Sequence, residues 1–428
     1  MSVDVVTLLQ RLVACNTSNP PGNEAQAVAI LEEVLVPAGI ECERVAKDPE
    51  RPNLVARLRG RGGGPSLAFL GHSDVVQARR EDWSVEPFAG TLRDGAVWGR
   101  GTVDMKSQVA ATAAALVTLA EQGFRPNGDL ILIVAADEEV GEAGVGTPFL
   151  VEERPDIAPD FLVGEGAGER YETPQGPVYL VDHGVKCTTP GELVVTGTAG
   201  DASLAGSGDD ALLSLARLLE RFDRHPPELR VTEPVEPLLA LFSTDGSAGE
   251  RVAAVRSANA ALGEIAESLT TNVFVPTTAR SQSPTNVVPD RAQAELYGAT
   301  LPGCSKDELE QELRRRFGEG DYQLELSEPE GGLTSATDTP LFRAIEDLIA
   351  DRDPGARVVP TLGYGFSDCH LMREKHGTVA YGFIPFRHVD PAVNLHSKHG
   401  RDERVLVDDL HFQLEAALTI ARTIGTAA

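Results

Sequence analysis

The sequence predicts an α/β fold in which a mixed-sheet domain, with helices on both faces, is interrupted by a smaller α+β block. Short apolar runs alternate with helical patterns from residue 53 to residue 165. Near Cys187 the pattern changes to alternating strands and charged amphipathic helices, and after about residue 305 the α/β alternation returns. A chain of 428 residues also favours two domains, because single hydrophobic cores stop growing near about 250–300 residues. The expected division is 1–186 and 305–428 for the two segments of the larger domain, and 187–304 for the inserted domain.

The first segment is expected to alternate helices with strands. Apolar residues recur every three or four positions in the expected helices, and the Ala-rich third helix ends at Gly123. Continuous apolar runs of about four to eight residues are typical of strands that are buried on both faces. The expected helices are 5–15, 25–41 and 105–123, and the expected strands are 53–60, 66–76, 129–139 and 159–168.

The inserted block differs from the first segment in the type of its strands. Its first strand, at 191–200, alternates apolar and polar side chains, as antiparallel strands with one solvated face do. The expected elements up to residue 317 are strands at 191–200, 270–282 and 292–303 and helices at 209–222 and 306–317. The closing segment is expected to contain a helix at 340–352, a strand at 378–385 and a last helix at 405–425.

The composition argues against several classes of protein. The chain has 65 acidic and 38 basic side chains and a formal charge of -27, whereas nucleic acids are bound by basic surfaces. No run of about 18 apolar residues is present, so no membrane span is expected. The N-terminus has an early acid and no basic start, which is unlike a secretory signal. Five scattered cysteines without a Cys-x-x-Cys motif indicate reduced thiols in a cytoplasmic protein.

Polar side chains follow the apolar runs of the stretch 66–139. They are His72 and Asp74 after one expected strand, Asp104 at the start of the Ala-rich helix, and Glu138 and Glu139 after the next strand. Because the carboxyl ends of strands in an open α/β sheet face one crevice, these side chains are expected to converge. An imidazole together with several carboxylates is the donor set of a divalent metal site. The stretch therefore indicates a metal-dependent hydrolase.

Each of these residues also has an ordinary structural explanation. A histidine at a strand end is often hydrogen-bonded to a nearby carboxylate, and acidic pairs usually face solvent. An aspartate before a helix can cap it, and Glu165, at the end of the strand at 159–168, could be a turn residue. All of these explanations would have to hold at once, which favours the metal site.

Five motifs, in this order, closely resemble those of a known family. They are GHSDVV (71–76), GRGTVDMK (99–106), ADEEVG (136–141), VGEGAG (163–168) and HGRDERVLVDDL (399–410). Over nearly its whole length the chain resembles the di-zinc metallopeptidase family of carboxypeptidase G, aminoacylases, acetylornithine deacetylase and succinyl-diaminopimelate desuccinylase. The resemblance implies a small-molecule substrate. It also implies that the inserted block is a ferredoxin-like lid through which two copies form a homodimer.

The resemblance implies two metal ions that are bridged by the carboxylate of Asp104. His72 and Glu165 would hold one ion, and Glu139 and His399 would hold the other. Histidine and carboxylate donors suit zinc, which is the expected metal, and cobalt or manganese would also fit.

Two further residues are implied to act without binding metal. Asp74 would fix the tautomer and orientation of His72, and Glu138 would be the general base and acid. His396 is an alternative to His399 as the metal ligand. The acidic pair that begins three residues after His399 matches the closing motif of the family better, which favours His399.

The inserted block departs from the family at two positions. Members usually carry a lid histidine that steadies the oxyanion in the partner's active site, and Asp201 stands at that place here. The lid arginine that grips a substrate carboxylate is replaced by Ala299, whereas Asn286 matches the lid asparagine. Arg280 is a candidate for the missing positive charge. Substrate choice is therefore expected to differ from that of the N-acyl amino acid members, with Asp201 facing a cationic or amine group or displaced from the site.

Three functions compete on these observations. The first is a metal-dependent peptidase, N-acyl amino acid deacylase or other amidohydrolase that acts on a small molecule. The second is a deaminase-like or other C–N hydrolase with a non-peptide, for example aromatic, substrate, which the two lid departures favour. The third is a metal-binding homologue without turnover, which is disfavoured because every implied ligand and Glu138 are present.

Overall fold

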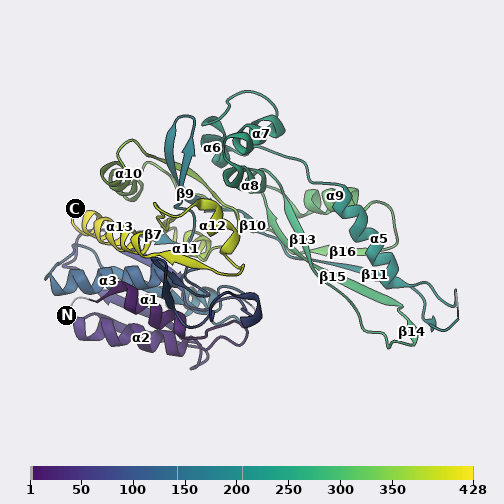
Figure 1. Cartoon of the computed structure of the whole chain (residues 1–428), viewed down its shortest axis with the longest axis horizontal. Helices are drawn as coiled ribbons and strands as arrows, with labels where there is room; N and C mark the ends of the chain where they lie inside the picture. The colour runs from purple at the N-terminus through teal and green to yellow at the C-terminus, as the bar shows by residue number, and fades with distance from the viewer. Residues whose placement is uncertain (1–2, 142, 205, 428) are drawn as a thin grey trace.

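Two sheet-based units make up the protein in the computed structural model, which describes residues 3–141, 143–204 and 206–427. The larger unit contains both ends of the chain, and the second, elongated unit projects from it (Figure 1). In the part of the chain that is described, no helix is both long and apolar enough to cross a bilayer.

A mixed nine-stranded sheet forms the centre of the larger unit. Its order is β1-β2-β6-β3-β7-β19-β9-β18, and β8 pairs with β9. β3 is parallel to β6 and β7, whereas β2 is antiparallel to β6. The strands are β1 (Glu41–Val45), β2 (Asn53–Leu58), β3 (Leu67–His72), β6 (Leu130–Ala135), β7 (Phe161–Gly164), β8 (Arg170–Thr173), β9 (Gly176–Val185), β18 (Arg357–Gly363) and β19 (Val379–Gly382).

Helices cover both faces of this sheet because the central strands are apolar on both sides. In β6, Leu132 and Val134 pack into one hydrophobic cluster, and Ile131 and Ile133 pack into a second cluster on the opposite face. The first face is covered by α1 (Val5–Ala14), α2 (Ala25–Leu35), α3 (Lys106–Glu121), α10 (Pro340–Arg352) and α13 (Val407–Gly425). The other face is covered by α4 (Thr147–Glu153) and α11 (Cys369–His376).

The second unit is a largely antiparallel sheet with helices packed on it. Phe222 and Phe317 stack with ring centroids 5.0 Å apart at the centre of its core. The sheet consists of β10 (Cys187–Thr188), β11 (Gly191–Thr196), β13 (Val273–Ser281), β15 (Arg291–Thr300), β16 (Gln323–Leu326) and β17 (Glu330–Gly331). Its helices are α5 (Ala211–Arg224) and α9 (Lys306–Phe317), and a short pair is formed by β12 (Gly200–Asp201) and β14 (Val287–Val288).

The second unit does not follow the expected limits 187–304. β16 pairs with β11, and α9 packs on the same sheet, so residues beyond 304 complete it. Conversely, three helices from the middle of the block pack against β9 and β18 of the first sheet. These helices are α6 (Glu236–Ala240), α7 (Ala248–Ala258) and α8 (Ala260–Leu269).

A small three-stranded sheet brings the last part of the chain to the first. β20 pairs with β5, and Arg404 lies opposite Trp98, although about 300 residues separate them. The strands are β4 (Thr91–Arg93), β5 (Ala96–Trp98) and β20 (Arg404–Leu406), and α12 (Pro391–Ser397) precedes β20. This pairing carries the segment with His399 to the loop that contains Asp104.

One expected helix is shorter than predicted. The apolar spacing predicted a helix over 25–41, but α2 ends at Leu35 and a single 3-10 turn follows it. Pro37 lies in that turn, and Gly39 has a φ of 81°, a left-handed conformation that ends a helix and suits glycine. The chain then turns into β1, an edge strand that was not predicted.

Candidate metal centre

Parallel strand ends bring the first site residues together. β3 ends at His72, which is opposite Ala135, the last residue of β6. Glu138 and Glu139 follow β6, so these side chains leave the sheet at the same edge. His72 is buried, and its Nε2 lies 3.8 Å from Oε2 of Glu138 and 4.0 Å from Oε2 of Glu165. The strand ends therefore converge as the sequence predicted.

Asp104 lies between two histidines. Its Oδ1 is 3.0 Å from Nε2 of His72, and its Oδ2 is 3.1 Å from Nε2 of His399. Nε2 of His399 is also 2.9 Å from Oε2 of Glu139. The Asp104 carboxylate thus presents one oxygen to each of two imidazoles, which is the arrangement needed to bridge two cations.

Two groups of these side chains could hold a metal ion. One consists of His72, Glu138 and Glu165, and the other consists of His72, Asp104 and Glu139, with the donor atoms of each group within 4.8 Å of one another. Each group offers an imidazole and two carboxylates, which is a donor set that zinc accepts. Oε1 of Glu139 is buried without a hydrogen-bond partner, so it is available to a ligand.

Asp74 is fully buried and orients its neighbours in two ways. Nδ1 of His72 lies 3.0 Å from the backbone oxygen of Asp74 and 3.5 Å from its Oδ1. Because a carbonyl only accepts, Nδ1 carries a proton, and Nε2 is the ring nitrogen that faces the carboxylates of the cluster. The Asp74 carboxylate accepts hydrogen bonds from the backbone N–H groups of Glu138 and Glu139, at 3.2 and 3.1 Å, and from the amide of Asn19. The backbone of residue 74 thus orients the imidazole, and its side chain holds the two glutamates.

His399 reaches the acidic cluster, whereas His396 points elsewhere. Nε2 of His396 lies 3.1 Å from Oε2 of Glu264 on α8, and the His396 side chain is 61% exposed. His399 has a φ of 57°, and this turn after α12 directs its imidazole to Asp104. The geometry therefore supports His399 as the donor.

The cluster concentrates negative charge, which cations balance. Nζ of Lys398 lies 2.6 Å from Oε1 of Glu165 and 3.3 Å from Oδ2 of Asp104. Burial raises the pKa of Glu138 well above its ordinary value, and the charge of Glu165 adds to that shift. Burial lowers the pKa of His399, but hydrogen bonds to two carboxylates outweigh burial and raise that pKa to about 10. Carboxylates this close cannot all ionise in a buried site without positive charge among them, so the site favours cations.

The roles of Lys398 and Glu403 were not predicted from the sequence. Glu403 is fully buried and accepts hydrogen bonds from the backbone N–H groups of Val103 and Asp104 at 2.6 and 3.0 Å. Its other oxygen pairs with Arg100 at 2.6 Å. Glu403 therefore holds the loop that presents Asp104. The acidic pair of the closing motif was the available signal, but its sequence does not reveal what the carboxylate contacts.

The predicted lid residues lie away from the cluster. β12 and β14 are at the end of the second unit that points away from the first sheet (Figure 1). Asp201 is exposed there, and the backbone oxygen of Asn286 accepts a hydrogen bond from Ala202 at 3.1 Å. Arg280 pairs with Glu295 at 2.8 Å. The structure brings Asp201 and Asn286 together at the tip, and it places Arg280 in a separate surface ion pair.

Comparisons with known proteins agree with this arrangement. Residues 68–423 match the model of a family described as peptidase family M20/M25/M40. A succinyl-diaminopimelate desuccinylase from Parvibaculum lavamentivorans is 34% identical over 231 residues, which are 52% of this chain and 55% of the relative. That alignment spans about half of the Parvibaculum protein. A succinyl-diaminopimelate desuccinylase from Cereibacter sphaeroides is 28% identical over 390 residues, which are 90% of this chain and 92% of that relative.

A solved structure has the same architecture. The M20 family metallo-carboxypeptidase Sso-CP2 from Sulfolobus solfataricus aligns with a TM-score of 0.74 at 18% sequence identity, over 99% of this chain and 100% of that one. This likeness confirms the predicted fold class, a mixed α/β sheet with an inserted antiparallel sheet. The family match covers more than half of the chain and includes every residue of the cluster, which confirms the predicted class of metallohydrolase. The chain therefore belongs to peptidase family M20/M25/M40.

Proposed function

We propose that this protein hydrolyses an amide or other C–N bond of a small molecule with the help of two divalent metal ions. The observation that supports this most directly is Asp104, whose two carboxylate oxygens face the imidazoles of His72 and His399. The relatives' names, a desuccinylase and a carboxypeptidase, support amide substrates. Hydrolysis of an amide would add one water across the C–N bond and release a carboxylic acid and an amine.

The residues that are present fit such a pair of ions. We assign His72 and Glu165 to one ion and Glu139 and His399 to the other, with Asp104 shared. The unpartnered Oε1 of Glu139 supports this assignment, as does the negative charge of the cluster. Zinc suits these donors, and cobalt or manganese is the alternative. When bound, the ions would supply Lewis acidity and lower the pKa of the attacking water.

Glu138 is the proposed proton carrier. Its backbone N–H is held 3.2 Å from Oδ1 of Asp74, and its carboxylate borders the cluster beside His72. Burial, together with the charge of Glu165, raises the pKa of Glu138 well above its ordinary value, which makes its carboxylate a stronger base. A base in this position can take a proton from water and return it to the leaving nitrogen.

Removal of metal is expected to abolish hydrolysis, because the cluster then lacks its Lewis acid. Protein dialysed against a chelator would be assayed on N-acyl amino acids, dipeptides and amino-aromatic amides, before and after addition of zinc, cobalt or manganese. Recovery that saturates at about two equivalents of metal per chain is the expected result. Full activity in the chelated protein would contradict the proposal. Activity confined to aromatic amides would favour the second candidate, a hydrolase of non-peptide C–N bonds.

We also propose that the second unit is a lid through which two copies assemble. Asp201 and Asn286 lie on the tip that points away from the metal centre of their own chain, where a second copy could receive them (Figure 1). In this proposal the lid consists of 187–228 and 270–331, and the intervening helices belong to the catalytic domain. The support is the pairing of β16 with β11 and the packing of α6 to α8 on the first sheet.

Replacement of Asp201 by Ala or His is expected to change substrate preference more than turnover on the best substrate. The carboxylate is exposed and accepts hydrogen bonds from Ser203, so its loss leaves the metal centre of its own chain intact. The measurement is kcat/KM across the amide panel for both variants. Asp321→Ala, at another exposed position of this unit, is the matched control. An unchanged panel in both variants would remove Asp201 from substrate recognition.

The proposed partners and location follow from charge and cysteine chemistry. The formal charge of -27 supports a protein without a nucleic-acid partner. All five cysteines are free, which supports a reducing compartment such as the cytoplasm. A thiol-specific label that modifies fewer than five cysteines in denatured protein from cells would count against the reducing compartment.

A further inference from the structure

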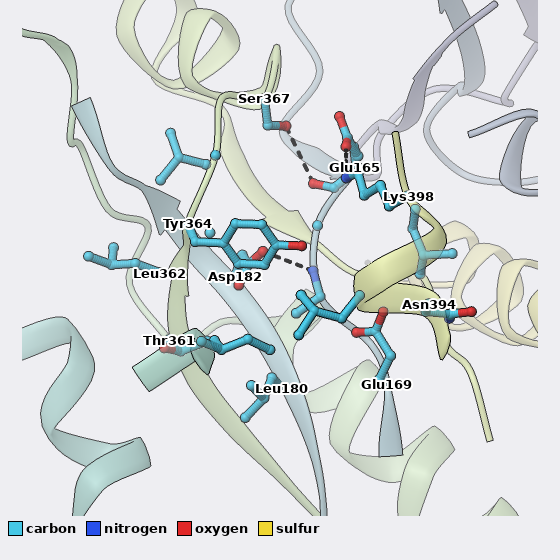
Figure 2. Close-up of a pocket in the computed structure, with 18 of the residues that line it drawn as sticks. Glu165, Glu169, Leu180, Asp182, Thr361, Leu362, Tyr364, Ser367, Asn394 and Lys398 are labelled. Atoms are coloured by element: carbon cyan, nitrogen blue, oxygen red, sulfur yellow. Dashed lines mark hydrogen bonds and ion pairs between the residues drawn. The ribbon is translucent and has the colours of Figure 1, made fainter. Parts of the chain in front are cut away.

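A pocket opens directly beside the metal centre. Glu165 and Lys398 form the side that the pocket shares with the cluster, and the lining continues past Ser367 and Tyr364 to Asp182 and Glu169. Figure 2 shows these side chains around one space, with Tyr364 next to Asp182 and with Glu169 near α12. A substrate whose scissile bond is at the metal centre could therefore extend a side chain into this pocket.

The walls of the pocket combine apolar surface with two carboxylates. Leu180, Leu362, Ile384 and Phe386 line it and are buried. This apolar surface suits an alkyl chain rather than a small polar group. A ligand that fills the pocket would therefore have a hydrocarbon part and a polar end.

The two carboxylates lack a cationic partner. Asp182 accepts one hydrogen bond, 2.8 Å from the backbone N–H of Ala167, and neither Asp182 nor Glu169 has an ion pair within 4.0 Å among the described residues. Among the described residues that line the pocket, Lys398 is the one lysine or arginine, and its ammonium is held by Asp104 and Glu165. The far part of the pocket therefore holds two carboxyl groups that have no ion-pair partner among the described residues.

The surroundings of Asp182 keep its carboxylate in place. A Cβ at Gly166 would lie 2.7 Å from Oδ2 of Asp182, and a Cβ at Gly363 would lie 3.1 Å from the same atom. Glycine at both positions therefore leaves room for a charged group beside the backbone. Burial raises the pKa of Asp182 to about 7, because a buried carboxylate loses the solvation that favours its charged form.

Asn394 is an independent sign of a ligand. Its side chain lines the pocket and is 1% exposed. The amide N–H of Asn394 interacts with the carboxylate of Glu169, whereas its amide oxygen has no hydrogen-bond partner among the described residues. Buried amides are normally paired, because an unpaired one costs roughly 1–3 kcal/mol. The free amide oxygen of Asn394 offers an additional acceptor to a group that donates several hydrogen bonds. An ammonium group has three N–H donors and no acceptor, which matches these acceptors.

We propose that this pocket is a specificity site for a primary ammonium group at the end of a short alkyl chain. Asp182 and Glu169 bind the ammonium group, Asn394 accepts one of its hydrogen bonds, and the apolar walls contact the chain. The inference rests on the proposed function and gives it a substrate class: amides of amino acids or related molecules that bear a side-chain amine.

The test compares substrates that differ only at the end of this side chain. Glycyl-lysine and lysyl-glycine are each paired with the analogue that contains 2-aminoheptanoic acid, in which a methyl group replaces the ammonium group. For the zinc-loaded full chain, kcat/KM is expected to favour the lysine member of at least one pair by about ten- to a hundredfold, as for a hydrogen bond to a charged group. Asp182→Asn removes the charge but keeps an oxygen that can accept the hydrogen bond from Ala167. Glu169→Gln removes the charge but keeps the size and shape of the side chain. Each is expected to reduce the preference about tenfold, mainly through KM.

Control measurements separate this inference from the proposed function. Glu346→Gln, at an exposed position of α10, is the matched control and should leave the preference unchanged. Calorimetric binding of all four dipeptides to the zinc-loaded Glu138→Gln protein provides a second measurement that does not need turnover. Equal cleavage of both members, or binding of both with equal affinity, would overturn the specificity site and leave the hydrolase intact. Absence of metal-dependent cleavage of every amide would instead contradict the proposed function. The binding data would then still show whether the pocket prefers the ammonium group. Failure of every dipeptide to bind overturns the specificity site as well.

Discussion

Glu138→Gln is expected to lower kcat by about 10²–10⁴-fold, the range for loss of a general acid–base group, with metal content unchanged. The glutamine keeps the size of the side chain and the backbone hydrogen bond to Asp74, but it cannot carry a proton. The carboxylate of Glu138 is buried next to Glu165, which raises its pKa and strengthens it as a base. The measurement is kcat on a cleaved amide together with metal content by elemental analysis.

Metal analysis distinguishes this role from a direct ligand role. Glu138 belongs to one of the two groups that could hold an ion, with His72 and Glu165. If Glu138 were a ligand, the variant would lose about half of its metal along with its activity. Equal turnover of wild type and variant would contradict the proposed mechanism. Glu346→Gln, at an exposed position of α10, makes the same chemical change outside the cluster and should leave kcat and metal content unchanged.

Asp104→Ala is expected to abolish binding of both ions, and activity with it. The Asp104 carboxylate is the contact shared by His72 and His399, so its removal affects both donor groups at once. A metal that binds only the folded state stabilises it by about 3–4 kcal/mol when its concentration is 100–1,000 times Kd. Chelator should therefore lower the Tm of wild type, and it should leave the Tm of Asp104→Ala almost unchanged.

The matched control for this variant is Asp94→Asn. Asp94 has an exposed side chain and a φ of 52°, a conformation that asparagine tolerates. Metal content, Tm with and without chelator, and kcat are measured on all three proteins. Retention of one equivalent of metal by Asp104→Ala would show that the carboxylate belongs to one ion only. Retention of two equivalents would remove Asp104 from the site.

Strand ends made the cluster predictable. Apolar runs that end at His72 and before Glu138 imply parallel strands, and parallel strands bring their carboxyl ends to one edge. His399 was predicted by a different route, the resemblance of its motif, because no local pattern relates it to Asp104. In the structure, the pairing of β20 with β5 provides the physical reason. The roles of the individual ligands stay proposals that the two variants above test.

The limits of the second unit could not be predicted from local patterns. The amphipathic spacing of α9 shows that one face is buried, but it does not show which sheet covers that face. In the structure, Leu309 and Leu313 of α9 join the core around Phe222 of α5, which places this helix on the second sheet. The hydrophobic effect is non-directional, so an apolar helix face does not specify which sheet covers it, and the pairing of β16 with β11 brings this segment to the second sheet.

The sequence by itself determined the fold class, the family and the set of candidate metal donors, because strand periodicity and motif spacing are local properties of the chain. The tertiary structure decided what surrounds those donors. Lys398 beside Glu165, Glu403 under the loop of Asp104, and the acidic pocket of Asp182 are contacts between segments far apart in the chain. Such contacts depend on how strands and loops pack in three dimensions, which single-sequence patterns do not encode. The reaction class was therefore predictable, whereas the proposed preference for an amine-bearing substrate depends on the folded pocket.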